Sequence, residues 1–262
     1  MSTLKYRIRT FFKYWDLIVE LVKRDIKLKY RRSFLGYIWS ILNPLLIMIV
    51  MTVVFSSMFR KSIENYPIYL LTGRTLFEFM KGSTTSGMKS VTHNAALLKK
   101  TYIPKYIFTL AKSLSILTDT VFTLGAFFIV MIATRTAFHL PLLYLPVILI
   151  QVFIFSLGIS FLLAQMMVFF RDIEYIYNAV LTAWTYLTPM FYPIDRLPNL
   201  LQILVRTVNP MYGYVTQFRS IALYGQMPSG RLMLAGWIWA IVMLIIGLYM
   251  FQKNKDKFIL YI

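Results

Sequence analysis

A basic run joins a long apolar segment without a linker over residues 24–46, RDIKLKYRRSFLGYIWSILNPLL, and the apolar segment continues to Met58. Ahead of this junction, apolar residues recur every three or four positions from Leu4 to Ile26, with Lys and Arg between them. That spacing predicts an amphipathic helix over residues 1–33. Such a helix lies in the membrane interface with its basic face toward anionic headgroups. The chain is therefore expected to approach a bilayer along its surface and then to enter it.

Long apolar segments follow along the rest of the chain. A membrane span needs about 20 mostly apolar residues, and four segments meet that requirement clearly: 35–58, 107–134, 141–170 and 232–251. Segment 174–192 is shorter and rich in aromatic residues, and segment 66–90 is interrupted by glycines and charges. We count both as spans, because small and hydroxyl residues permit close helix contacts inside a bundle. The predicted fold is all-α, with six transmembrane helices over residues 34–262.

Composition supports a polytopic membrane protein. The chain is 58 % hydrophobic and only 15 % charged, whereas soluble domains carry about 25 % charged residues. This disfavours the alternative of a solvated basic helix on a soluble domain. The absence of Cys excludes thiol chemistry, and His93 and His139 are too far apart to indicate a metal site. The net charge of +18 points to anionic partners, but not to nucleic acid, because the basic residues flank the spans.

The distribution of Lys and Arg sets the orientation of the spans. With six spans both termini lie on one side of the membrane. The basic residues are concentrated on that side: before the first span, after the second and after the last. The positive-inside rule then places both termini in the cytoplasm.

Two connections between spans are long enough to have a function. In the cytoplasmic one, residues 91–105, Asn94 can cap a short helix that Pro104 would end. A short helix projecting from the membrane offers a surface to another protein, although an ordinary ordered loop explains the same residues. The outer connection, residues 193–231, contains two helical patterns separated by Pro210. It predicts a re-entrant helical hairpin before the last span.

Catalytic patterns are absent or incomplete. The segment GSTTSGMKS at residues 82–90 resembles a phosphate-binding loop, but Met88 stands where that loop needs Lys, so we expect no ATP hydrolysis by this chain alone. Asp172 and Glu174 could form the metal-binding pair of a membrane glycosyltransferase. A helix cap and a first-turn acid explain the two carboxylates better. No catalytic residue and no metal site are therefore predicted.

Charges within the spans are costly unless they are paired or face water. The intramembrane polar residues of interest are Arg74, Glu78, Lys81 and Asp119. They would form ion pairs that fix the bundle, or line a polar conduit, and the sequence leaves both interpretations open.

Aromatic residues make up 17 % of the chain and gather near the outer ends of the spans. The densest group is Trp184, Tyr186, Phe191 and Tyr192. An interfacial aromatic belt explains most residues of this kind in membrane proteins. A passage for sugars would use the same side chains, because aromatic rings stack on the C–H faces of pyranoses.

Six segments resemble, in order along nearly the whole chain, the membrane subunit of the type-two ABC exporters that move polysaccharides and teichoic acids out of bacteria. They are RDIKLKYRRSFLGYIWSILNPLL at 24–46, YLLTG at 69–73, NAALLKKTYIPK at 94–105, FFRDI at 169–173, TPMFYPIDRLP at 188–198 and NPMYGYVTQFR at 209–219. Each segment is modest alone, and their order makes the resemblance specific. The charged second span departs from the usual pattern of the family.

The resemblance implies a homodimer in the bacterial cytoplasmic (inner) membrane that pairs with two separate ATPase subunits. ATP and Mg would be bound by those subunits, with no cofactor in this chain. The implied substrate is a long glycan on an undecaprenyl-type lipid, and which glycan is not readable from the sequence. The alternatives are a related exporter of a drug or small lipid, and a membrane-embedded glycosyl- or acyltransferase.

The resemblance also implies roles for three groups of residues. The element that couples to the ATPase would comprise Asn94, Leu97, Leu98, Lys99, Lys100, Tyr102 and Pro104. The lipid head would meet Arg24, Lys27, Lys29, Arg31 and Arg32, although plain positive-inside charge explains most of this group. The glycan path would contain the aromatic group Trp184, Tyr186, Phe191 and Tyr192.

Overall fold

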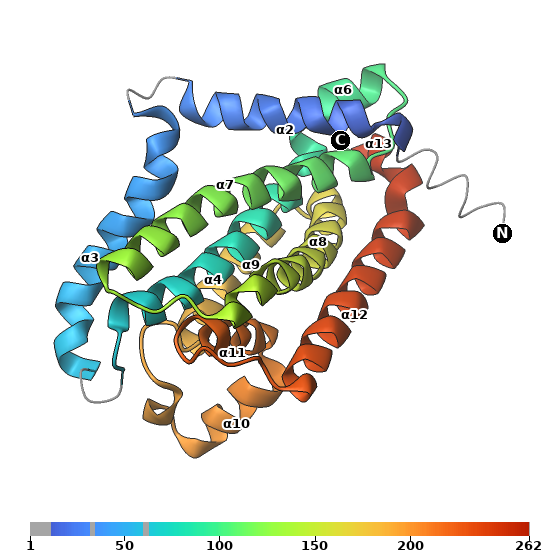
Figure 1. Cartoon of the computed structure of the whole chain (residues 1–262). Helices are drawn as coiled ribbons and strands as arrows, with labels where there is room; N and C mark the ends of the chain where they lie inside the picture. Colours follow the sequence, from blue (N-terminus) through green and yellow to red (C-terminus); the bar gives the residue numbers. More distant parts are fainter. Residues whose placement is uncertain (1–11, 32–34, 60–62, 262) are drawn as a thin grey trace.

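The computed structural model describes residues 12–31, 35–59 and 63–261, and every regular element within these ranges is a helix (Figure 1). Four helical segments of the described chain are long and apolar enough to cross a membrane: Gly36–Phe59, Tyr106–Ala133, Leu140–Phe169 and Gly230–Lys257. They coincide with the four clearest predicted spans and confirm them. The all-α class is confirmed over the described residues as a whole.

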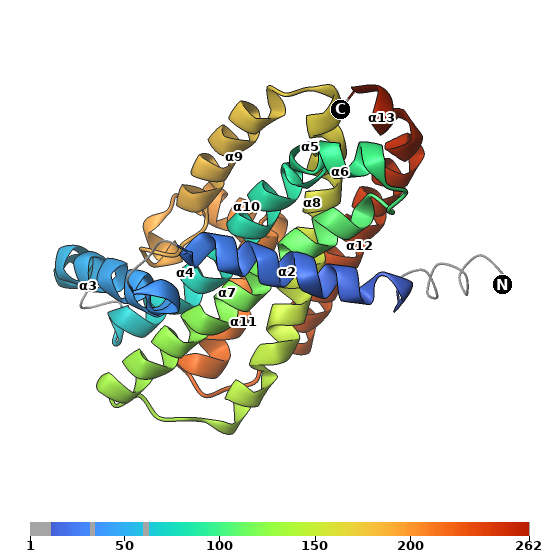
Figure 2. The ribbon, with the colours of Figure 1, turned by 90° about the horizontal axis from the view of Figure 1, so that it is seen from above.

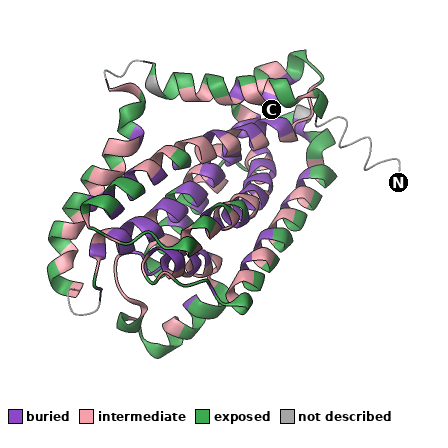
Figure 3. Ribbon diagram, viewed as in Figure 1, coloured by how far each residue is buried: buried purple, intermediate pink, exposed green. Residues whose placement is uncertain are grey.

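Helix α4 (Tyr66–Met88) lies in the interior of the bundle, between α7 (Tyr106–Ala133) and α8 (Leu145–Phe169), as the burial colours of Figure 3 show. Most of its side chains are buried although its sequence is less apolar than that of the four spans. Hydroxyl groups tie it to its neighbours. Ser83 donates to the hydroxyl of Ser113 at 2.9 Å, and the hydroxyl of Tyr177 donates to Thr84 at 2.7 Å. Small and hydroxyl residues thus allow the close packing that the sequence predicts for 66–90.

Helix α12 (Gly230–Asn254) packs along α8 through direct contact of the two backbones. A Cβ atom added at Gly158 would lie 2.4 Å from the carbonyl carbon and oxygen of Met243. A Cβ atom added at Gly247 would lie 2.0 Å from the carbonyl oxygen of Gly158. The approach of the two helices therefore requires glycine at both positions.

Helix α2 (Trp15–Tyr30) lies across one end of the bundle, alongside α7 and at a steep angle to α12 (Figure 1; Figure 2 shows the same end from above). The earlier part of the predicted interface helix, residues 1–11, lies outside the described residues. Short helices gather at this end as well: α5 (Ser90–His93), α6 (Ala95–Lys100), η4 (Lys255–Lys257) and α13 (Phe258–Tyr261). One hydrophobic cluster, called here the α2-end cluster, joins α2, α5, α6 and α13 to α7, α8 and α12. Its buried residues include Ile18, Leu21, Val91, Leu98, Phe108, Phe161, Phe251 and Phe258.

The opposite end of the bundle carries the helices of the predicted outer connection. These are η3 (Ile194–Arg196), α10 (Asn199–Val208) and α11 (Pro210–Ala222), while the short helix η2 (Leu140–Tyr144) precedes α8. Helix α11 is largely buried against α4 and α8, whereas α10 is largely exposed. The hairpin pattern of two helices separated at Pro210 is present, and its depth in a membrane stays a prediction.

Two helices lie at the margin of the bundle. Helix α3 (Trp39–Phe59), preceded by the turn η1 (Gly36–Ile38), lies at the edge of the bundle (Figure 2) and buries only Met48 among its apolar side chains. Helix α9 (Ile173–Leu187) ends five residues before the predicted limit of 174–192. Thr188 has extended backbone angles and stands before Pro189, whose ring disfavours a helical conformation in the preceding residue. The prediction of helix over 188–192 is therefore wrong.

Candidate functional site

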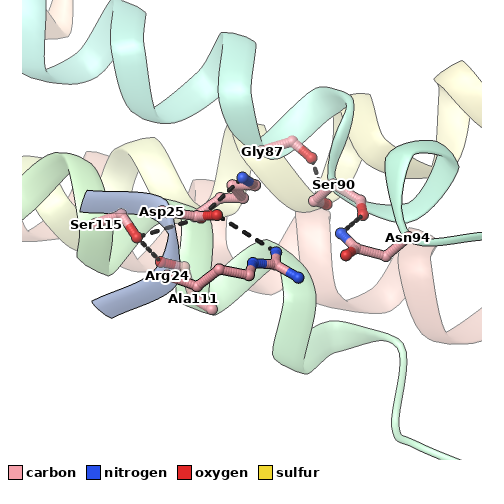
Figure 4. Close-up of polar contacts among 8 residues, drawn as sticks. Arg24, Asp25, Gly87, Ser90, Asn94, Ala111 and Ser115 are labelled. Atoms are coloured by element: carbon pink, nitrogen blue, oxygen red, sulfur yellow. Dashed lines mark hydrogen bonds and ion pairs between the residues drawn. The ribbon is translucent and has the colours of Figure 1, made fainter. Parts of the chain in front are cut away.

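Helix α2 is attached to α7 by two ion pairs. Asp25 accepts from the ammonium group of Lys112 at 2.7 Å, and Lys29 donates to Asp119 at 2.6 Å. Arg24 and the hydroxyl of Ser115 also contact the carboxylate of Asp25, at 3.3 and 3.5 Å (Figure 4). Asp119 thus takes part in an ion pair between two helices, which is one of the two interpretations left open for the charges of the spans.

These contacts change the expectation for the predicted lipid-head group. Lys29 is held by Asp119, so its charge is partly neutralised within the protein. Arg24, Lys27 and Arg31 are exposed on α2 and the turn that follows it. Arg32 lies outside the described residues. The interaction of this group with a lipid head stays a prediction. Arg24 and Lys29 are exposed but paired with Asp25 and Asp119, and Lys27 and Arg31 are exposed as well.

A cavity of about 310 Å³ lies where α2, α3, α4 and α7 meet. Its lining includes Lys29, Arg74, Glu78 and Asp119, so three of the four intramembrane polar residues lie around one space. Arg74 and Glu78 also approach each other within α4, at 3.7 Å. Lys81 is exposed one turn further on and does not line this cavity. Arg74 and Glu78 thus line this cavity and pair within one helix, so the choice between bundle-fixing pairs and a polar conduit stays a prediction for them.

The predicted coupling element consists of two short helices and an extended segment at the α2 end. Asn94 occupies the N-cap position of α6, as predicted, but its side chain makes no cap bond and donates instead to the carbonyl oxygen of Ser90 at 2.8 Å. Ser90 in turn donates to the carbonyl oxygen of Gly87 (Figure 4). These bonds make the element a direct continuation of the buried helix α4.

Exposure divides the coupling residues into two classes. Leu98 is buried in the α2-end cluster and Leu97 packs against it. Lys99, Lys100 and Tyr102 are exposed, and the side chain of Tyr102 is 99 % exposed. A fully exposed tyrosine beside two lysines offers groups for contact with another protein, whereas the leucines hold the element in place.

The chain leaving the coupling element is attached to the end of α12. After Pro104, Lys105 donates to the carbonyl oxygen of Lys255, and its ammonium lies 5.4 Å from the ring centre of Phe258. Burial lowers the pKa of Lys105, while the carboxylate of Asp256 acts in the opposite direction. The start of α7 and the end of α12 are thereby held together.

The aromatic group predicted for the glycan path is spread over different surroundings. Trp184 is part of the packing of the bundle: its indole donates to Asn209 at 2.8 Å and its ring meets Phe77 and Phe155 edge-on. Phe191 and Tyr192 lie in the turn after α9, and the hydroxyl of Tyr192 donates to the carbonyl oxygen of Tyr186. Of the four side chains, only that of Tyr186 is mostly exposed. A role of these four residues in the path stays a prediction.

The two members of the acidic pair after α8 lie in different surroundings. Glu174 pairs with Lys89, the residue that follows α4, while Asp172 is exposed at the N-cap position of α9 without a side-chain cap bond. Within the part of the chain that the structure describes, no group of three His, Asp or Glu residues could hold a metal ion. The pairing of Glu174 argues against the transferase alternative, which needs both carboxylates on a donor or a metal.

A second cavity, of about 720 Å³, opens at the end of the bundle opposite α2. Sequence reasoning missed its deepest charged group, Arg219, which is only 7 % exposed. The sequence contains a signal for its burial, because Val215, Phe218 and Ala222 are apolar residues that share a helical face with Arg219; all three are buried in the structure. An Arg on the apolar face of a helix is unusual enough to be singled out.

Comparison with known proteins gives consistent results over almost the whole chain. Residues 16–223 match the family model described as ABC-2 type transporter. A relative from Myxococcus xanthus, named O-antigen export system permease protein RfbA, is 26 % identical over 252 residues, which are 96 % of this chain and 97 % of the relative. Two relatives of the same name from Klebsiella pneumoniae are 27 % and 29 % identical, each over 97 % of both chains.

Proposed function

Because the chain belongs to the ABC-2 type transporter family, we propose that it is the membrane subunit of an ATP-driven exporter that moves a lipid-linked cell-envelope glycan across the cytoplasmic membrane. The observation that carries the proposal is its similarity, over nearly its full length, to permease proteins of O-antigen export systems. O-antigen is therefore the first glycan to test. A drug or a small lipid is the alternative cargo.

The proposed subunit crosses the membrane six times, with both termini in the cytoplasm. Helices α4 and α9 would complete the six spans, and α4 is suited to this because its neighbours cover its polar residues. The excess of basic residues around α2 and at the end of α12 supports a cytoplasmic position for that end. Helices α10 and α11 would then form a re-entrant hairpin at the outer face.

The proposed assembly contains two copies of this chain and two ATPase subunits. A separate ATPase is supported by the sequence, whose nearest approach to a phosphate-binding loop lacks the required Lys and lies within the buried helix α4. The exposed apolar side chains of α3 and α9 supply surface for a second copy or for lipid. The lipid-linked glycan would enter from the cytoplasmic leaflet, near the exposed basic residues of α2.

Co-purification and export together test the proposed function. The tagged chain, extracted from its native membrane, is expected to bring down an ATPase subunit in stoichiometric amount. Deletion of the chain is expected to remove a glycan from the cell surface and leave its lipid-linked precursor inside. A folded chain without any ATPase partner, or an unchanged surface glycan in the deletion strain, would contradict the proposal.

The coupling element makes a prediction of its own. Combining Tyr102→Ala with Lys100→Glu is expected to lower ATPase co-purification about tenfold or more, since an exposed aromatic residue and a charge at a contact are each worth about 1 kcal/mol or more. The subunit itself should stay folded, because both side chains are exposed. Size-exclusion chromatography and quantitative immunoblotting measure the two effects.

Two further variants show whether the loss comes from the contact surface. Lys253→Glu, an equal charge change at the exposed end of α12, is expected to leave co-purification unchanged. Leu98→Asp is expected to destabilise the subunit itself, because Leu98 is buried in the α2-end cluster. Normal ATPase binding by the Tyr102 and Lys100 double variant would show that the ATPase docks elsewhere.

A further inference from the structure

The cavity opposite α2 contains a buried positive charge that the protein does not neutralise. All ten acidic residues of the chain lie within the described ranges, and in those ranges Arg219 forms no ion pair with any of them. Its guanidinium lies over the ring of Tyr69, 3.4 Å from the ring centre. A buried charge is costly unless it is paired and hydrogen-bonded.

The hydrogen bonds of Arg219 use only part of its donor capacity. Nη2 makes long bonds to the carbonyl oxygens of Tyr69 and Met190, at 3.3 and 3.4 Å. Nε is buried without a partner among the described residues. Gly73 leaves the room for the guanidinium, because a Cβ atom there would lie 3.1 Å from Nη2. The guanidinium is thus held in position with donors unused, and the residue lines the cavity.

The remaining wall of the cavity offers rings and polar groups in the combination that sugars need. Tyr212 and Tyr224 supply aromatic rings. Asn65, Thr134 and His139 are polar residues of the lining, and of these Asn65 already donates to Thr136 and Thr134 to the carbonyl oxygen of Val130. The volume of about 720 Å³ falls within the roughly 300–1,000 Å³ of small-ligand sites. Aromatic faces contact the C–H groups of a pyranose while polar side chains bind its hydroxyls, so both kinds of group are used.

We propose that this cavity, which we call the outer vestibule, binds a sugar unit of the exported chain, with Arg219 donating to an acidic or hydroxyl oxygen of that unit. The inference rests on the proposed function, which makes the cargo a glycan and this end of the bundle the outer one. The site would hold the chain just after it leaves the membrane. A sugar unit bound there would hinder the return of the glycan into the membrane, so the site would favour outward movement of the glycan.

Single cysteines can report on the site directly, because the chain has no Cys of its own. Tyr224 lines the vestibule and is 66 % exposed, whereas Met227, three residues on, is 54 % exposed and outside the lining. Tyr224→Cys and Met227→Cys would each be labelled in intact cells with a membrane-impermeant maleimide. The labelling rates would be compared between cells that make the glycan and cells in which its first sugar transfer is blocked.

Glycan synthesis is expected to slow the labelling of Tyr224→Cys several-fold and to leave that of Met227→Cys unchanged. Adding Arg219→Gln to Tyr224→Cys should abolish this protection without changing the rate in glycan-free cells. A purely structural role of Arg219 would not produce that pattern. Should Arg219→Gln fail to fold, Tyr212→Leu tests the same wall of the vestibule.

The outcomes separate this inference from the proposed function. If Met227→Cys reacts and the glycan reaches the surface, but Tyr224→Cys is labelled equally with and without glycan, the vestibule is not a sugar site and the export function stands. Protection that survives both Arg219→Gln and Tyr212→Leu also overturns the site. If neither cysteine reacts from outside, the orientation is wrong and both proposals fail.

Discussion

A Gly158→Ala variant is expected to lose the folded state of this membrane subunit, or to keep it only at reduced temperature. The added methyl group would lie 2.4 Å from main-chain atoms of Met243 on α12. No side-chain rotation can relieve a clash with a backbone, so α8 and α12 must move apart along their whole contact. Overpacking that side chains can absorb already costs about 1–3 kcal/mol, and we expect at least about 3 kcal/mol here. Gly247→Ala should behave in the same way.

The measurement is the fraction of tagged subunit that stays monodisperse in detergent after a heating series. Gly230→Ala is the matched control, because it lies on the same helix α12 and a Cβ atom there meets nothing within 4 Å. This control should melt like the unmodified chain. A Gly158→Ala variant as stable as Gly230→Ala would show that α8 and α12 are not in backbone contact.

An Asp25→Lys variant is expected to release α2 from α7. The carboxylate of Asp25 accepts from Lys112 at 2.7 Å, and its side chain is only 12 % exposed. The substitution replaces this attraction by repulsion between two ammonium groups, that of the introduced lysine and that of Lys112, in a partly buried position. Between about 1 and 3 kcal/mol should be lost, more than an exposed pair contributes and less than a fully buried one. Because α2 is part of the α2-end cluster, binding of the ATPase should weaken as well.

Two matched variants test the cause of that loss. Adding Lys112→Asp restores an ion pair of reversed polarity and should recover much of the stability, which a double-mutant cycle would quantify. Glu20→Lys breaks an exposed pair with Lys23 on the same helix and should cost well under about 1 kcal/mol. A double variant no more stable than Asp25→Lys alone would show that the pair does not hold α2 in place.

Features set by length and composition could be predicted from this sequence. Four spans were found because hydrocarbon thickness demands a minimum run of apolar residues. The buried helix over 66–90 was found from its glycines and hydroxyl residues. The end of α9 was misjudged, since apolarity continues past Leu187 while the prolines that follow stop the helix. Asn94 and Asp172 occupy the predicted N-cap positions, but neither side chain makes the expected hydrogen bond to the start of its helix. The local sequence does not encode this difference.

Contacts between distant segments could not be predicted in the same way. The partner of Asp119 is Lys29, 90 residues earlier, and this choice depends on where α2 crosses α7. The backbone contact at Gly158 depends on the path of α12, because glycine in an apolar span has several common uses. The apolar neighbours of Arg219 on α11 suggest that it is buried, but its contacts with Tyr69 and Met190 depend on how α11 packs against α4, which the sequence does not encode.

The α2-end cluster has a mechanical consequence. It unites α2, α5, α6 and α13 with the adjoining ends of α7, α8 and α12, while α3 and α9 contribute no residue to it among the described side chains. A force applied at α6 is therefore transmitted to all seven helices of the cluster. A partner protein that pushes on α6 would move these helices together as one rigid unit. Helices α3, α4 and α9 contribute no described residue to the cluster, and of these α3 and α9 lie at the edge of the bundle, so we expect movement relative to the cluster at its margins next to α3 and α9 (Figure 2). A path for a large cargo would open there, by separation of whole helices and not by bending of one.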